Sequence, residues 1–103
     1  MNDMIPKELM TRYIHSIPEK ISEIERLYAI QSSQTVVDKT SQHCLNLRNC
    51  IHNLAGSGGA YGFSDITNTA RACLKVLDQD QCELPELQAK IDALILALKR
   101  VMK

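Results

Sequence analysis

Four glycines follow closely on one histidine, and this cluster constrains the fold more than any other feature of the sequence. Three of them lie within seven residues of His52, inside a segment with the apolar spacing of an amphipathic helix, and the fourth comes directly afterwards: Gly56, Gly58, Gly59 and Gly62. A glycine inside a helix weakens it by about 1 kcal/mol relative to alanine. A cluster with this cost indicates that bare helix surface near His52 serves a purpose.

The helical positions around His52 predict that its imidazole points to solvent. At about 100° per residue, with His52 at zero, the apolar residues occupy an arc between roughly 160° and 260°: Leu47, Cys50, Ile51, Leu54 and Tyr61. Gly56 and Gly59 fall within roughly 40° of His52, and Ala55 lies at about 60°. An exposed imidazole is largely neutral and nucleophilic at pH 7. The bare strip beside it would let a protein backbone or a tetrahedral anion approach the ring.

The same residues resemble the signature of the histidine-containing phosphotransfer (HPt) domain family. In that signature a histidine is followed by a hydrophobic residue at +2, a glycine at +4, and a run of small residues that leads to a glycine at +10. The matching residues are His52, Leu54, Gly56, Ser57, Gly59, Gly62 and Phe63. The resemblance covers the whole chain, residues 1–103, as one domain. It departs at Ala55, where many members carry a lysine near the phosphoryl group.

The resemblance implies a function and a set of partners. His52 would be the phosphoacceptor, taking a phosphoryl group on an imidazole nitrogen, most simply Nε2, from a receiver-domain aspartate and passing it to another receiver. Mg²⁺ would come with the receiver, so neither a cofactor nor a metal of the chain's own is expected. The protein would be a carrier in a phosphorelay, not an enzyme. Its partners would be response-regulator receiver domains, with a hybrid histidine kinase as a further candidate.

A second class of function stays open because Ala55 brings no cation. In this alternative the chain is a helical interaction module that docks on a receiver or a histidine kinase and regulates it without accepting phosphate. Binding of the partner would then be indifferent to His52.

Several side chains near His52 are candidates for the environment of a phosphoryl group or a partner. Arg48 lies one turn before His52, while Arg71 and Lys75 share a face of the following helix. Ser57 is a candidate hydrogen-bond donor. Two polar neighbours are candidates for partner contacts, Asn49 and Asn53. For the cations and the asparagines the alternative interpretation is a solvated helix flank, and for Ser57 it is simply a small helix residue.

Composition excludes several classes of function. Lys and Arg together number 12, as do Asp and Glu, so no net charge attracts nucleic acid or an anionic membrane. No segment is long and apolar enough for a membrane span, and the first residues do not form a signal peptide. We therefore expect a cytoplasmic protein, with its four cysteines reduced, and a monomer, because a dimer could cover the glycine strip. The cysteine and histidine spacing is not that of a zinc site. We expect His43 on the core side of its helix.

The apolar periodicity predicts an all-α fold, an antiparallel up-down four-helix bundle with a short N-terminal capping helix. The capping helix would run from Pro6 to about His15. A capping box at 16–19 would open the next helix, which would end near Gln31. The loop 31–35 would follow, and Val36 or Val37 would begin the helix that holds His52.

The second half of the chain contains clear boundary signals. Gly62 would end the His52 helix, and Ser64 would cap the next one, with Asp65 in its first turn. The polar segment 78–81 would form the last turn. Pro85 would then mark the first turn of the final helix.

Overall fold

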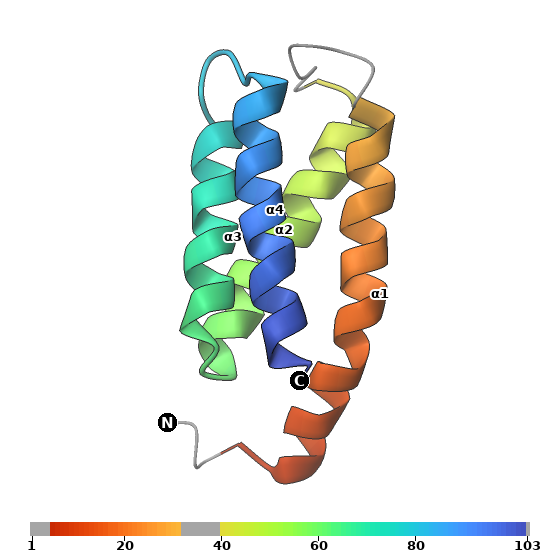
Figure 1. The fold of residues 1–103 in the computed structure, drawn as a ribbon, viewed down its shortest axis with the longest axis vertical. Helices are drawn as coiled ribbons and strands as arrows, with labels where there is room; N and C mark the ends of the chain where they lie inside the picture. The colour runs from red at the N-terminus through yellow and green to blue at the C-terminus, as the bar shows by residue number, and fades with distance from the viewer. Residues whose placement is uncertain (1–4, 32–39, 103) are drawn as a thin grey trace.

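The computed structural model describes residues 5–31 and 40–102 of the chain. This part contains four helices: α1 (Lys7–Gln31), α2 (Gln42–Ala60), α3 (Ser64–Leu77) and α4 (Leu84–Val101). They lie side by side and run alternately up and down, with the chain's direction reversing at each connection (Figure 1). The predicted all-α, antiparallel up-down four-helix bundle is therefore confirmed.

Each helix buries one aliphatic stripe in a common core. The largest fully buried side chains come from all four helices: Ile17, Ile24, Leu27, Leu47, Ile51, Leu54, Ile66, Leu77, Leu87, Ile91, Leu94 and Leu98. Full burial of such a side chain stabilises the fold by about 1.5–3 kcal/mol. The four cysteines are thiols without disulfide bonds, and burial raises the pKa of Cys73 to about 12.

The N-terminal helix differs from the prediction, because the expected capping helix and the helix after it form one continuous α1. Ser16 is not an N-cap, since its hydroxyl donates to the carbonyl of Tyr13 at 2.6 Å. Pro18 lies inside the helix, although an interior proline costs about 3 kcal/mol. The core stripe from Tyr13 through Ile17 to Ile21 continues across this position, and its burial holds the helix together. The first turns of α1 extend below the other helices and curve beneath the bundle (Figure 1).

The helix that holds His52 begins later than predicted. The hydroxyl of Ser41, its N-cap, accepts a hydrogen bond from the backbone N–H of Cys44 at 3.1 Å. The predicted start at 36–37 and nearly all of the predicted loop 31–35 lie outside the described residues. At the other end, α2 stops at Ala60 and Gly62 takes a φ of 83°. That left-handed conformation favours glycine, so the predicted break at Gly62 is confirmed.

The remaining boundaries agree with the sequence to within a residue. Phe63, not Ser64, occupies the N-cap position of α3, and no side chain caps this end. Asp65 lies in the first turn of α3, as predicted, and Pro85 lies in the first turn of α4. The polar segment 78–81 begins the connection between these two helices, which runs from residue 78 to residue 83.

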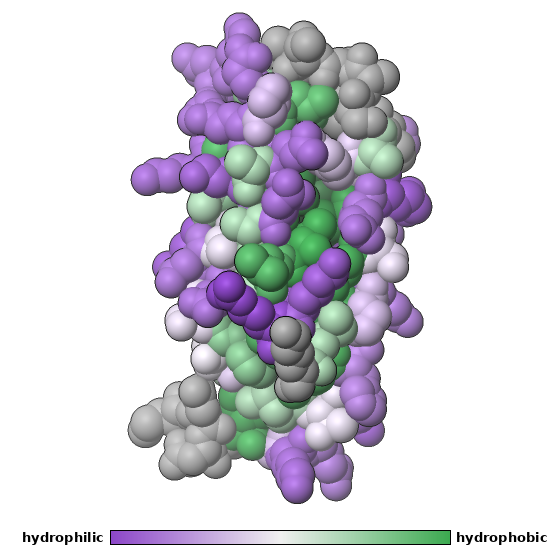
Figure 2. Space-filling model, in the orientation of Figure 1, coloured by the Kyte–Doolittle hydropathy of each residue, from purple (hydrophilic) through white to green (hydrophobic). Residues whose placement is uncertain are grey.

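Apolar surface is exposed along the seam between α1 and α4, with hydrophilic side chains on either side (Figure 2). A shallow hollow on this face is lined by Glu25, Asp92, Ile95, Leu96 and Lys99. Leu96 is 51% exposed, the largest such fraction among the described apolar side chains of its size. Within the described ranges, no helix has the length and apolarity needed to cross a membrane.

Candidate functional site

His52 lies in the middle of α2 with its imidazole exposed. Its neighbours on the opposite side, Ile51 and Leu54, are 0% and 1% exposed, so the core holds the helix in this orientation. Among the described residues, no hydrogen bond or ion pair engages the His52 ring. The exposed ring is therefore accessible to a reagent from outside the protein.

The glycines of α2 differ sharply in what surrounds them. A Cβ added at Gly58 would lie 2.9 Å from Ile66 Cγ2 and 2.9 Å from Thr67 Oγ1, so the close packing of α2 on α3 requires glycine there. A Cβ at Gly59 would lie 3.4 Å from Thr67 Oγ1, and one at Gly56 would meet nothing within 4 Å. The fold therefore explains Gly58 but gives no reason for the glycine at Gly56.

The solvent-facing side of α2 forms an uncharged strip, which we call the His52 strip. Its members are all exposed: Leu45, Asn49, His52, Asn53, Gly56, Gly59 and Ala60. Leu45 is 44% exposed and precedes His52 by two turns, about 10 Å along the helix. Arg48 is the only Lys, Arg, Asp or Glu residue in α2. A neutral strip of this length, centred on the histidine, is suited to a surface that loses its water against another protein.

Arg48 lies beside this strip, and its charge is paired. Its Nε donates to Asp78 Oδ1 at 3.1 Å and its Nη2 donates to Asp78 Oδ2 at 3.3 Å. Both side chains are partly exposed, so the pair joins α2 to the end of α3 with a modest energy. The guanidinium is thereby directed toward α3.

Arg71 and Lys75 are exposed on α3, where they line a shallow hollow together with Asn68 and Ala72. Neither forms an ion pair within the described part of the chain. Thr67, one turn before Arg71, is buried against α2. These two cations therefore belong to the helix that packs beside His52, not to α2 itself.

Ala55 and Ser57 both face neighbouring helices. The Ala55 side chain is half-buried, and its carbonyl accepts a hydrogen bond from Thr67 Oγ1 at 2.9 Å. The Ser57 hydroxyl is 2.9 Å from that of Tyr13 on α1. The structure therefore turns Ser57 toward α1 and gives its hydroxyl a partner there.

An aromatic cluster that sequence reasoning missed holds the glycine-rich end of α2 against α1. The Tyr13 ring stacks on Tyr61 at 4.3 Å and on Phe63 at 5.8 Å between centroids. The sequence gives little indication of this cluster beyond the small number of aromatic residues: the chain has one Phe, three Tyr and no Trp. Burial raises the pKa of the Tyr13 phenol, although its hydrogen bond to Ser57 acts in the opposite direction.

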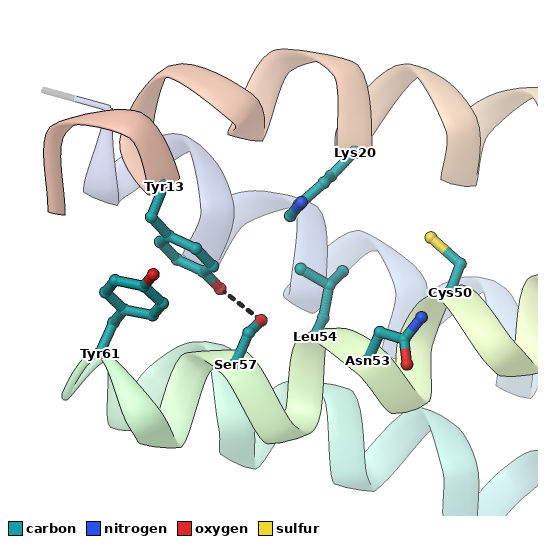
Figure 3. A pocket seen from close by; sticks show the side chains of 7 residues that line it. All are labelled: Tyr13, Lys20, Cys50, Asn53, Leu54, Ser57 and Tyr61. Carbon is teal, nitrogen blue, oxygen red and sulfur yellow. Dashed lines mark hydrogen bonds between the residues drawn. The ribbon is translucent and has the colours of Figure 1, made fainter. Parts of the chain in front are cut away.

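A groove of about 370 Å³ runs between α1 and α2, on the other flank of the helix from α3 (Figure 3). Its lining residues are Tyr13, Lys20, Cys50, Asn53, Leu54, Ser57 and Tyr61. Lys20 extends into the groove, with Nζ 5.8 Å from the centre of the Tyr13 ring. Burial raises the pKa of the Cys50 thiol, so this thiol is a weak nucleophile. Asn53 connects the groove to the His52 strip.

His43 is exposed, and its predicted place on the core side is wrong. The prediction included Tyr61 in the core arc, but Tyr61 lies beyond the last helical residue. The buried residues of α2 are Cys44, Leu47, Ile51, Leu54 and Gly58. Around the helix axis, the centre of this buried arc lies roughly 60° from the position of His43. Within the described ranges, no three or more His, Cys, Asp or Glu residues group together in a way that could hold a metal ion.

The fold and site together define a class of protein, a small helical bundle with an exposed histidine on an uncharged helix face. A family model described as the Hpt domain matches residues 8–103, and the chain therefore belongs to the Hpt domain family. Membership identifies a phosphotransfer module of two-component signalling, in a family of carriers whose partners are response-regulator receiver domains. No curated protein and no solved structure matches the chain.

Proposed function

We propose that this protein is a phosphorelay intermediate that accepts a phosphoryl group on His52 from one receiver domain and passes it to another. The observation that carries the proposal is the exposed, unbonded imidazole in the centre of the uncharged His52 strip. No second histidine of the described chain combines exposure with neighbouring glycines.

The proposed reaction is an in-line displacement at phosphorus. The lone pair of His52 Nε2 attacks the aspartyl phosphate, so a P–N bond forms as the P–O bond to the aspartate breaks. The aspartate leaves as a carboxylate, and the proton on Nδ1 of the imidazole can then pass to water. Mg²⁺ held by the receiver would neutralise the phosphoryl oxygens. Transfer to the second receiver is the same displacement in reverse, so the chain completes no turnover of its own.

The proposed docking surface is the His52 strip. A receiver must bring its aspartyl phosphate within bonding distance of Nε2, which requires close approach to the helix on both sides of the ring. Gly56 leaves open space on one side, and Leu45 offers an apolar contact at the other end of the strip. Asn49 and Asn53 provide amide groups for hydrogen bonds to the partner. A monomer fits this proposal, because a dimer formed through the strip would exclude the receiver.

The proposed setting is the cytoplasm. The four cysteines are thiols in the structure, and cysteines persist as thiols in a reducing compartment. Fractionation of cells that express the full chain would test the location directly.

The test of the proposal is phosphate transfer to a defined residue. The protein is incubated with receivers labelled on aspartate, in the presence of Mg²⁺, and we expect an acid-labile, alkali-stable phosphate on His52. A His52→Gln variant should remain unlabelled, while a His43→Gln variant, which alters another exposed histidine of α2, should be labelled like the wild type. Labelling of His52→Gln at the wild-type level would overturn the proposal.

The alternative is a non-phosphorylated module that docks on a receiver or kinase and regulates it. Two observations support this alternative: the chain has Ala55 where many family members carry a lysine, and Leu96 is 51% exposed in the hollow between α1 and α4. This alternative predicts partner binding that is indifferent to His52→Ala and no phosphohistidine by mass spectrometry.

A further inference from the structure

The packing of α2 on α3 sets which residues of the two helices lie at the same level. Thr67 bonds to the carbonyl of Ala55, and Asp78 bonds to Arg48. The two helices are antiparallel, so residues nearer the N-terminus of α2 lie beside residues nearer the C-terminus of α3. His52 lies between Ala55 and Arg48, so its level on α3 lies between Thr67 and Asp78, at the turn that contains Arg71.

His52 and Arg71 also flank the same side of the seam between the two helices. The Arg48–Asp78 pair spans this seam on its solvent-exposed side. His52 follows Arg48 by one turn of α2, and Arg71 precedes Asp78 by two turns of α3. Residues three, four or seven positions apart share a helix face. The imidazole and the Arg71 guanidinium therefore emerge on the same side, one from each helix.

The other cations near α2 are less suited to meet a phosphoryl group on His52. Arg48 is held by both carboxylate oxygens of Asp78. Lys20 lies in the groove on the opposite flank, over the Tyr13 ring (Figure 3). Lys75 is one turn beyond Arg71, past the level of His52.

Arg71 remains as the cation of α3 at the level of His52, and among the described residues it has no ion-pair partner. It is exposed and forms no ion pair or hydrogen bond within the described residues. Its guanidinium can donate two parallel N–H bonds to phosphoryl oxygens. No acidic side chain of the described chain has to release it before it moves.

We propose that Arg71 of α3 supplies the positive charge that Ala55 of α2 does not, binding the phosphoryl oxygens once the P–N bond to His52 has formed. This inference depends on the proposed function, since it names the group that stabilises the phosphorylated state. The charge then comes from the neighbouring helix, and the helix that carries His52 keeps an uncharged face for the receiver.

Two measurements on the full chain test the proposal. The protein is phosphorylated either by a labelled receiver or by phosphoramidate, a small donor that needs no docking surface. We expect Arg71→Ala to slow transfer from the receiver by about tenfold or more, the effect of losing a charge-assisted hydrogen bond. By ³¹P NMR, the second ionisation of the phosphohistidine should move to higher pH in this variant, because a nearby cation favours the dianion. Arg71→Lys should restore part of both effects.

Lys75→Ala and Arg48→Ala are the matched controls, because each removes one exposed or partly exposed cation near His52. Both should leave the ³¹P titration unchanged. Equal effects of Arg71→Ala and Lys75→Ala, or a larger shift in Arg48→Ala, would overturn the assignment of Arg71. If wild-type protein takes no phosphate on His52 from any receiver, the proposed function fails instead, and the phosphoramidate arm still reports on Arg71. Thermal melts of each variant exclude an effect through unfolding.

Discussion

Gly56 and Gly58 are separated by one residue of α2, yet they lie on opposite faces and for opposite reasons. At Gly58 a single added carbon would come within 3.0 Å of the Cβ of Ile66 and closer still to two side-chain atoms of α3. At Gly56 it would meet nothing within 4 Å. The inner glycine is needed by the fold, whereas the packing of the described residues does not require the outer one.

The difference shows how one helix can serve stability and function without compromise between them. On the inner face of α2, the close packing of α3 offsets the low helix propensity of glycine. On the outer face the same cost brings no packing in return, and under the proposed function Gly56 leaves room for the receiver. Substitutions on the two faces should therefore affect different measurements.

The largest expected effect on this comparison is the loss of stability in Gly58→Ala. The new Cβ forces Ile66 or Thr67 to move, and overpacking of this kind costs about 1–3 kcal/mol. Better helix propensity returns about 1 kcal/mol. We expect a net loss of up to about 2 kcal/mol, seen as a Tm lower by up to roughly 15 °C for a chain of this size. A Gly58→Ala protein that melts at or above the wild-type temperature would show that α3 can retreat without cost.

The next effect concerns Leu45 on the His52 strip and Leu96 on the α1–α4 face, which have similar exposed fractions of 44% and 51%. Truncation of an interface anchor costs more than 1 kcal/mol, so Leu45→Ala should weaken receiver binding by about tenfold. Leu96→Ala should leave binding unchanged. Isothermal titration calorimetry with an unphosphorylated receiver measures the binding affinity of both variants. The reverse result would place the partner on the α1–α4 face and support the regulatory module that accepts no phosphate.

A smaller effect is expected from Gly56→Ala, which should raise the stability of the domain and lower the rate of phosphate transfer. Because the new methyl group meets nothing, the domain should become more stable by up to about 1 kcal/mol. Transfer from the receiver should nevertheless slow by several-fold, since the methyl group occupies the space beside His52, and Gly56→Leu should slow it further. Stopped-flow transfer rates and thermal melts on the same samples separate the two parts. If Gly56→Leu transfers phosphate at the wild-type rate, the open space beside the imidazole has no role in docking.

The sequence predicted the outward direction of His52 and the four helices because these depend on residues close together in the chain. The spacing of Leu47, Ile51 and Leu54 fixes the buried face of α2, and the ring of His52 must then point away. The continuous α1 was not predicted, since a serine followed by a proline is a strong local signal for a helix start. Burial of the stripe around Ile17 overrides that signal, and such packing is not visible in the local sequence.

The contacts around the site could not be predicted, because each joins residues far apart in the chain. The Tyr13–Ser57 bond spans 44 positions and the Arg48–Asp78 pair spans 30. Both depend on the level at which two helices pack, which periodicity does not specify. For the same reason the sequence left three cations as equal candidates, and only the packing of α2 on α3 separates Arg71 from Arg48.

The smallest expected effect is the energy of the Arg48–Asp78 pair, measured in a double-mutant cycle of Arg48→Ala and Asp78→Ala. Both side chains are about half exposed, so the coupling should be about 0.2–1 kcal/mol and should fall as salt is added. Chemical denaturation of the wild type, the two single variants and the double variant gives this coupling energy.

The functional part of the cycle is more informative: Asp78→Ala releases the Arg48 guanidinium one turn from His52. If this change speeds phosphate transfer and Arg48→Ala abolishes the gain, the pair restrains a second cation that the site can use. If neither variant alters transfer, the pair joins α2 to α3 and leaves the phosphoryl group to Arg71.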